Sequence, residues 1–249
     1  MLKALCLDFD GVIVNSTKEC LYVALETYKE LNKEKSNDFT PTQYKQLIKL
    51  RPMVRGAHEY LKAIAIVLNK INISSHELFS KLPIENFYDK KFINTFRENF
   101  YKKRNNLISN DIEYWVNLHE YYFDIFNLMK ERLNKIKNEN IYIISLKDKS
   151  SISNLLRFKG IKNLPFILDC EDINNKPEGL DQVCKKYDFQ KNEILFIDDN
   201  PLHLNECIIE GYENCYLPEW NHDFLIKSVG ISNLKLINVQ LIKDNYFHS

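Results

Sequence analysis

The feature that most constrains this fold is the uneven placement of short apolar segments along the chain. One lies at residues 2–10, and the others all follow residue 140 of the 249-residue sequence. Each is too short and too rich in β-branched or aromatic residues for a helix, and its continuous apolarity predicts a strand covered on both faces. The later segments are residues 141–145, 164–169 and 193–199, with a weaker one at 214–220.

Helical patterns separate these expected strands. Apolar residues recur at helical spacing in residues 121–137, 151–160 and 179–189. Alternation of buried strands with helices is typical of a parallel sheet that carries helices on its faces. The sequence therefore predicts an α/β fold with a Rossmann-like, doubly wound parallel sheet.

A long helical block interrupts this alternation. Between residues 17 and 118 the apolar spacing is helical, Pro41, Pro52 and Pro83 separate the segments, and no strand-like stretch intervenes. We expect an all-helical domain at residues 17–118, inserted after the first strand of a core that is formed by residues 1–16 and 119–249.

Composition excludes several classes of protein. Lysine and arginine total 34, as do aspartate and glutamate, so no basic surface for nucleic acid or membrane is expected. The six cysteines form no C-x-x-C pair, which favours reduced thiols over a disulfide framework. The first residues do not form a signal peptide, and no window approaches the roughly 18–20 apolar residues of a membrane span. We expect a cytoplasmic protein.

Polar and acidic residues follow the expected strands at their carboxyl ends. In a parallel sheet these ends share one edge, where ligands bind. Clustered acids repel one another unless cations lie among them, and a divalent cation with oxygen ligands is the simplest remedy. The residues are Asp8 and Asp10 after the first strand, Ser145 after the second, Lys176 beyond the third, and Asp198 and Asp199 after the fourth.

Each element of this pattern is weak when taken alone. An isolated Asp-x-Asp-Gly could form a simple turn. A calcium-binding loop that starts at Asp8 is excluded, because its fifth and sixth positions would be Val12 and Ile13. The combination of an acid pair, a serine, a lysine and a second acid pair, each near an expected strand end, is the specific signal.

These segments resemble the four motifs of the haloacid dehalogenase superfamily of phosphohydrolases. "LCLDFDGVIVNS" resembles the first motif, and "IYIISLKDK" resembles the second, a strand that ends in Ser or Thr. Lys176 in "NKPEG" and the acid pair in "ILFIDDNP" resemble the third and fourth. The resemblance covers residues 1–16 and 119–220. It implies an inserted helical cap, and it does not identify the substrate.

The resemblance implies a catalytic role for each carboxylate of the first motif. Asp8 is expected to attack phosphorus and form an aspartyl-phosphate. Asp10 is expected to protonate the leaving oxygen and later to take a proton from the attacking water, and this role counts against dehalogenation. Gly11 is expected to let the backbone turn close to the phosphoryl group.

The resemblance also implies binding residues. Mg²⁺ is expected on Asp8, the backbone carbonyl of Asp10, and Asp199, with Asp198 binding directly or through water. The phosphoryl oxygens are expected on Ser145, Lys176 and nearby backbone amides such as that of Leu146.

Two features near the motifs differ from the family pattern or have no role assigned by it. His203 stands where many family members have an acid, and it is expected to support the site and not to bind metal. Glu171 and Asp172 either hold Lys176 in place or belong to a solvated loop.

The function expected from these residues is Mg²⁺-dependent hydrolysis of a small anionic phosphorylated metabolite. A phosphomutase of the same superfamily shares all four motifs and remains an alternative, and a non-catalytic phosphate-binding protein is a third. Arg51 and Arg55 are candidate substrate ligands on the cap, because they would share one side of a helix that begins before Pro52. Paired surface arginines are the competing interpretation, and Arg104 is a weaker candidate of the same kind.

Overall fold

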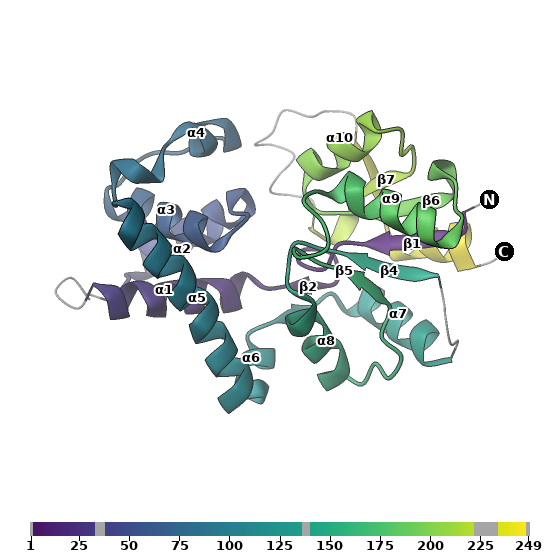
Figure 1. Cartoon of the computed structure of the whole chain (residues 1–249), viewed down its shortest axis with the longest axis horizontal. Coiled ribbons are helices and arrows are strands. Elements are labelled where there is room, and N and C mark those ends of the chain that lie inside the picture. The colour runs from purple at the N-terminus through teal and green to yellow at the C-terminus, as the bar shows by residue number, and fades with distance from the viewer. Residues whose placement is uncertain (1, 33–37, 136–139, 222–233, 248–249) are drawn as a thin grey trace. The chain divides into compact units, whose positions relative to one another are not determined.

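The computed structural model of the chain describes residues 2–32, 38–135, 140–221 and 234–247 and contains two compact units (Figure 1). One comprises Met1–Asn15 and Glu120–Ser249 and is called the sheet unit below. The other comprises Ser16–His119 and is called the helical unit. The sequence prediction placed the helical domain at residues 17–118.

A six-stranded parallel sheet forms the centre of the sheet unit, with the order β5-β4-β1-β6-β7-β8. Strand β1 lies between β4 and β6, and Leu5 is in register with both Ile141 and Leu195. All residues of β1, β4 and β6 are buried, as expected for strands covered on both faces. The strands are β1 Ala4–Leu7, β4 Ile141–Ile144, β5 Phe166–Leu168, β6 Ile194–Ile197, β7 Cys215–Pro218 and β8 Lys235–Ile237. The predicted parallel sheet is confirmed.

Strand β8 was not predicted from the sequence. It is three residues long and only Ile237 is buried, so it carries too little apolar pattern to be recognised. The chain then continues through α12 (Val239–Ile242) to Tyr246, whose hydroxyl donates to the carbonyl oxygen of Asn140 at 2.6 Å. The C-terminal segment is thereby connected to the residue that precedes β4.

The helices of the sheet unit begin next to the strand ends. Asp148, Asn175 and Asn200 each accept a backbone N–H at the start of the helix that follows. Helix α9 begins at Lys176, three residues earlier than predicted, because Pro177 fits the first turn of a helix. The helices are α7 Phe123–Lys135, α8 Lys149–Phe158, α9 Lys176–Tyr187 and α10 Pro201–Ile209. The expected end of α7 at residue 137 lies outside the described residues.

A short antiparallel pair joins the two segments that flank the helical unit. Strand β2 (Val14–Asn15) pairs with β3 (Glu120–Tyr121), with Val14 opposite Tyr121. Both strands have only two residues, which leaves no periodic pattern in the sequence. The pair holds the two segments side by side.

The described part of the helical unit contains helices and connecting segments with a hydrophobic core of their own. Phe79, Phe96 and Phe100 are fully or almost fully buried in that core. Thr40 and Gln43 form a capping box at the start of α2, and Asp89 caps α5. The helices are α1 Thr17–Leu31, α2 Pro41–Leu50, α3 Ala57–Leu68, α4 His76–Lys81, α5 Lys90–Asn110 and α6 Ile112–Asn117, with short 3-10 turns at Arg51–Met53 and Ile84–Asn86.

A buried ion pair connects α1 and α5 inside the helical unit. Arg104 Nε lies 2.7 Å from Glu19 Oε1, and Arg104 Nη2 lies 3.0 Å from Glu19 Oε2. The indole N–H of Trp115 donates to the same carboxylate at 3.3 Å. The guanidinium of Arg104 is therefore occupied by Glu19, which favours a structural role for this arginine over substrate binding.

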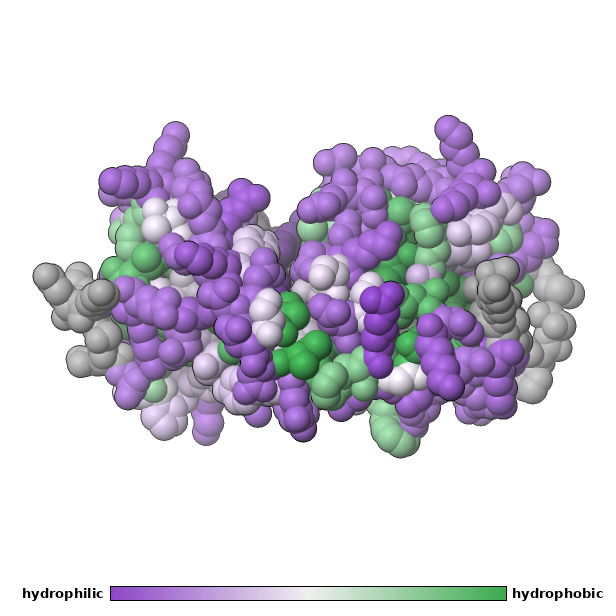
Figure 2. All heavy atoms as spheres, turned by 60° about the horizontal axis from the view of Figure 1, so that its bottom comes forward, coloured by the Kyte–Doolittle hydropathy of each residue, from purple (hydrophilic) through white to green (hydrophobic). Residues whose placement is uncertain are grey.

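Hydrophilic residues form most of the molecular face drawn in Figure 2, with smaller hydrophobic areas among them. Among the described helices, none is long and apolar enough to cross a membrane.

Candidate active site

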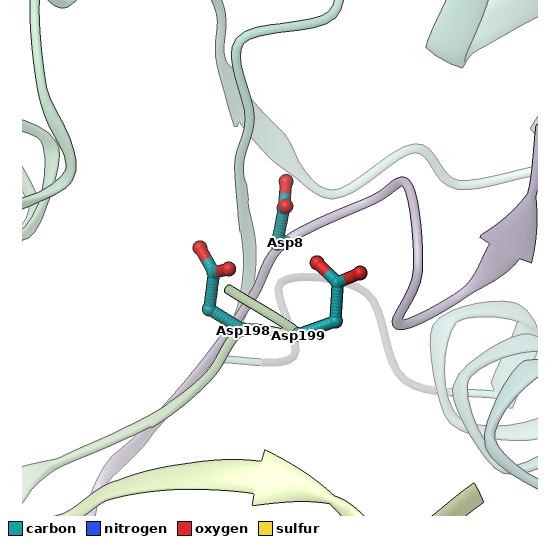
Figure 3. A group of neighbouring side chains, drawn as sticks. All are labelled: Asp8, Asp198 and Asp199. Atoms are coloured by element: carbon teal, nitrogen blue, oxygen red, sulfur yellow. The ribbon is translucent and has the colours of Figure 1, made fainter. Parts of the chain in front are cut away.

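Three carboxylates meet where β1 and β6 end. The backbone N–H of Asp8 donates to the carbonyl oxygen of Ile197 at 2.9 Å, which continues the pairing of these strands one residue beyond β1. Oxygen atoms of Asp8, Asp198 and Asp199 all lie within 4.8 Å of one another. Figure 3 shows the three side chains extending to the same side of the chain. The register of two adjacent parallel strands thus creates the cluster.

Lys176 places its ammonium group among these acids. Its Nζ lies 2.8 Å from Asp8 Oδ1 and 3.3 Å from Asp198 Oδ2, and it donates to the carbonyl oxygen of Ile144 at 2.6 Å. The side chain of Lys176 is only 1% exposed. The first residue of α9 thereby links the ends of three strands, β1, β4 and β6.

The pKa values of these groups reflect burial and pairing. Burial raises the pKa of Asp8, and Lys176 only partly offsets this effect. Burial also favours protonation of Asp198, but the Lys176 ammonium and His203 outweigh it and hold the pKa of Asp198 well below its usual range. Burial opposes the charge on Lys176, yet Asp8 and Asp198 raise its pKa above the ordinary value. The cluster thus retains a buried positive charge beside Asp8.

Asp198 is held by Asn200, the N-cap of α10, and by His203 in the first turn of that helix. Nδ1 of His203 lies 3.1 Å from Asp198 Oδ2, and the backbone N–H of Asn200 donates to Asp198 Oδ1 at 2.8 Å. Asn200 Nδ2 lies 3.4 Å from the other ring nitrogen of His203. His203 thus contacts Asp198, which agrees with a supporting role for this histidine.

Gly11 makes the turn after Asp10 possible and lies close to Asp199. Its φ of +87° is in the region that favours glycine, and a Cβ atom there would lie 2.1 Å from Asp199 Oδ2. Asn221 Nδ2 donates to the carbonyl oxygen of Gly11 at 2.8 Å and lies 3.3 Å from Asp199 Oδ2. Trp220 Nε1 donates to the carbonyl oxygen of Val12 at 3.0 Å. Trp220 was expected at the end of the strand 214–220, but β7 ends at Pro218, and Trp220 and Asn221 lie in the 3-10 turn that follows.

The segment after β4 carries Ser145, Leu146 and Lys147, and it places Lys147 beside Asp10 of the first motif. Ser145 is buried, Leu146 is half-buried, and the backbone N–H of Lys147 donates to Ser145 Oγ at 3.3 Å. Nζ of Lys147 lies 3.5 Å from Asp10 Oδ1. Lys147 was not assigned a role from the sequence. Its signal was its position two residues after Ser145, which matches the offset of Asp10 from Asp8.

The acids in the loop after β5 do not hold Lys176. Glu171 and Asp172 are both exposed, in agreement with a solvated loop. Asp169 is buried instead and accepts hydrogen bonds from the backbone N–H groups of Lys149 at 2.7 Å and Glu171 at 3.0 Å. Asp169, which was not singled out from the sequence, connects this loop to the start of α8.

Arg51 and Arg55 do not share one side of a helix, so that prediction was wrong. Helix α2 ends at Leu50, Arg51–Met53 form a 3-10 turn, and Val54 is extended with φ −93° and ψ 124°. Arg51 Nη1 donates to the carbonyl oxygen of Val54 at 3.3 Å, and Arg55 is exposed. Pro52 is accommodated in the turn and not in a continuous helix, because it supplies no backbone N–H.

The donor set suits a small, hard divalent cation. Three carboxylates approach one another with Lys176 as the cation paired to two of them. Oxygen ligands with this charge are those that Mg²⁺ and Ca²⁺ prefer, and Mg²⁺ characteristically takes few protein carboxylates together with phosphate oxygens. The residues therefore fit a hard divalent cation with oxygen ligands.

Comparison with known proteins gives the same assignment at the level of the family. A model of the haloacid dehalogenase-like hydrolases matches residues 2–203. No curated protein was found to match the chain.

Solved structures share the fold at low sequence identity. A structure from Bacteroides fragilis, provisionally assigned as a haloacid dehalogenase-like hydrolase, has a TM-score of 0.67 and 16% identity, with 97% of this chain and 100% of that chain covered. A haloacid dehalogenase-like family hydrolase from Streptococcus pneumoniae has a TM-score of 0.66 and 12% identity, with 98% of each chain covered. A structure from Haemophilus somnus described as a predicted phosphoglycolate phosphatase has a TM-score of 0.66 and 13% identity, also with 98% of each chain covered.

Proposed function

Because this chain belongs to the haloacid dehalogenase-like hydrolase family, we propose that it is a Mg²⁺-dependent phosphatase of small phosphorylated metabolites. The observation that carries the proposal is the ionic cluster at the ends of β1 and β6. A carboxylate oxygen of Asp8 lies within 4.8 Å of oxygens of Asp198 and Asp199, and Asp8 Oδ1 lies 2.8 Å from the buried Nζ of Lys176. Neighbouring structures that are described as phosphatases support this choice of hydrolase.

Asp8 is the nucleophile of the proposed reaction. Its Oδ1 accepts hydrogen bonds from the backbone N–H of Phe9 at 2.7 Å and from Lys176 at 2.8 Å, so its orientation is fixed before a substrate binds. A carboxylate oxygen forms a bond to phosphorus while the bond from phosphorus to the leaving oxygen breaks. The positive charge of Lys176 opposes protonation of the nucleophile.

Asp10 is the proton donor and acceptor. Its side chain is partly exposed, as suits a group that exchanges protons with substrate and water. It gives a proton to the leaving oxygen in the first step and takes one from water in the second. Water attacks the phosphorus of the aspartyl-phosphate, which releases phosphate and restores the Asp8 carboxylate.

Asp8, Asp198 and Asp199 would hold the metal ion, together with the backbone carbonyl of Asp10. A bound Mg²⁺ supplies positive charge that offsets the charge on the phosphoryl oxygens. Ser145 and the amide of Leu146 are the proposed protein contacts of these oxygens, and Lys176 acts through Asp8 and Asp198, which it holds in place. Arg51 and Arg55 remain proposed ligands for a second anionic group of the substrate.

A panel of small phosphorylated metabolites, including phosphoglycolate, tests the proposal. We expect release of inorganic phosphate from at least one of them in Mg²⁺, no release after removal of the metal by EDTA, and recovery when Mg²⁺ is restored. Asp8→Asn, with an amide in place of the nucleophile, should lower the rate by about 10⁴-fold or more.

Two outcomes of this assay contradict the proposal. A phosphomutase would return an isomeric phosphate ester without releasing phosphate. Substantial turnover by Asp8→Asn would exclude the aspartyl-phosphate mechanism for any substrate.

A further inference from the structure

Lys147 is a buried lysine beside the proposed acid and base. It lies three residues after the end of β4, and its side chain is only 3% exposed. Its Nζ is 3.5 Å from Asp10 Oδ1, within the range of an ion pair. Among the described residues, however, no acceptor forms a hydrogen bond with this Nζ, although the atom is shielded from solvent. A buried ammonium group without hydrogen bonds is costly, because each of its three N–H groups has lost its contact with water.

The second lysine of the site differs in this respect. An ammonium group has three N–H donors. Those of Lys176 have three acceptors within the protein: Asp8 Oδ1 at 2.8 Å, Asp198 Oδ2 at 3.3 Å and the carbonyl oxygen of Ile144 at 2.6 Å. Lys176 therefore orients protein groups and can contact a ligand only by giving up one of these acceptors. Lys147 has donors that the described protein atoms leave unused.

The surroundings of Lys147 indicate which ligand it binds. Ser145, which is proposed to bind a phosphoryl oxygen, lies two residues earlier, and its Oγ accepts a hydrogen bond from the backbone N–H of Lys147. Its ammonium group lies beside Asp10, the proposed donor to the leaving oxygen. A phosphoryl group that Asp8 attacks, and whose leaving oxygen Asp10 protonates, would bring oxygen acceptors close to Nζ of Lys147.

Resting on the proposed function, we propose that Lys147 is a direct ligand of the substrate phosphoryl group, on the side of Asp10. Its N–H groups bind a non-bridging phosphoryl oxygen and stabilise the charge that accumulates there during transfer. Lys176, in contrast, acts through Asp8 and Asp198. The two lysines thus have different roles: Lys147 binds the phosphoryl group, and Lys176 holds the carboxylates of Asp8 and Asp198.

Binding of inorganic phosphate in the presence of Mg²⁺ tests this division without requiring turnover. Isothermal titration calorimetry would compare wild type with Lys147→Met, which retains an apolar stem and removes the charge. We expect a loss of phosphate affinity of about tenfold or more, the range for a hydrogen bond to a charged group. Lys149→Ala is the matched control, since this exposed lysine two residues later should leave the affinity unchanged.

Two further measurements are the phosphate affinity of Lys147→Arg and the Mg²⁺ affinity of Lys147→Met. Arginine keeps the charge and the donors, so Lys147→Arg should recover part of the lost affinity. Mg²⁺ binding measured without phosphate should be similar in wild type and Lys147→Met, because no contact of Lys147 with Asp198 or Asp199 is found among the described atoms. Unchanged far-ultraviolet circular dichroism would show that the variant folds.

The outcomes separate this inference from the function on which it rests. If wild type hydrolyses a phosphomonoester and Lys147→Met binds phosphate as wild type does, the inference is wrong and the function stands. A loss of phosphate affinity with equal loss of Mg²⁺ affinity would also overturn it, since Lys147 would then act through the metal site. If wild type neither binds phosphate nor hydrolyses any ester, both proposals fail.

Discussion

The two units of this protein each contain a cluster of buried and half-buried charged side chains, and the clusters differ in the balance of their charges. In the helical unit one acid meets one base: Glu19 and Arg104 form two hydrogen bonds of 2.7 and 3.0 Å. In the sheet unit four acids and two lysines lie close together. These are Asp8, Asp10, Asp198 and Asp199 with Lys147 and Lys176, which leaves an excess of negative charge when all are ionised.

This difference separates structural from functional use of buried charge. A buried ion pair with matched geometry needs no ligand, and removing either partner leaves an isolated charge. An unbalanced cluster costs stability in the free protein and gains from a cation or an anion that completes it. We interpret the sheet-unit cluster as functional because it contains an excess of carboxylates and an ammonium group for which the described residues supply no hydrogen bond.

The largest expected effect on stability comes from breaking the Glu19–Arg104 pair of the helical unit. Glu19→Gln should lower the free energy of unfolding by about 3–5 kcal/mol, the usual cost of leaving a buried charge without its partner. Chemical denaturation measures this change. The same change at Asp8, Asp8→Asn, should leave the stability close to that of wild type or raise it, because burial already disfavours the charge there. Equal destabilisation by both variants would remove the distinction between the clusters.

A smaller effect is expected from the exposed arginine of the helical unit. If Arg55 binds a second anionic group of the substrate, Arg55→Ala should raise KM for the natural substrate by about tenfold and leave KM for p-nitrophenyl phosphate unchanged. Arg51→Ala tests the half-buried residue in the same way, although Arg51 also lies over the ring of Tyr60. Identical kinetics of variant and wild type on both substrates would assign these arginines no role in specificity.

Much of the sheet unit could be predicted from the sequence because its signals are local. Continuous apolar runs identify buried strands, and the acids that follow them mark one edge of the sheet. That reasoning placed Asp8, Asp198 and Asp199 at one edge of the sheet before their separation was known.

Other features depend on contacts that no local pattern encodes. Asn221 reaches Gly11 from 210 positions away, and this contact has no sequence signal. The predicted helix through Arg51 and Arg55 was wrong because apolar spacing does not show where Pro52 converts a helix into a turn. The assignment of Lys176 as a phosphate ligand did not anticipate that Asp8, Asp198 and Ile144 would use its donors.

The central claim is that the sheet-unit cluster carries a nucleophile at Asp8, and trapping of the aspartyl-phosphate tests it most directly. Asp10→Asn should still react with p-nitrophenyl phosphate in Mg²⁺, because its leaving group needs little protonation. Attack by water should be slowed by about 10²–10⁴-fold, since the residue that takes the proton is missing. The double variant Asp8→Asn/Asp10→Asn is the matched control.

After acid quenching, peptide mass spectrometry of Asp10→Asn would locate the phosphate. We predict a phosphate adduct on the peptide that contains Asp8, in an amount that matches the initial burst of p-nitrophenol, and none in the double variant. A burst of p-nitrophenol without an adduct at Asp8, or an adduct on another residue, would contradict the account.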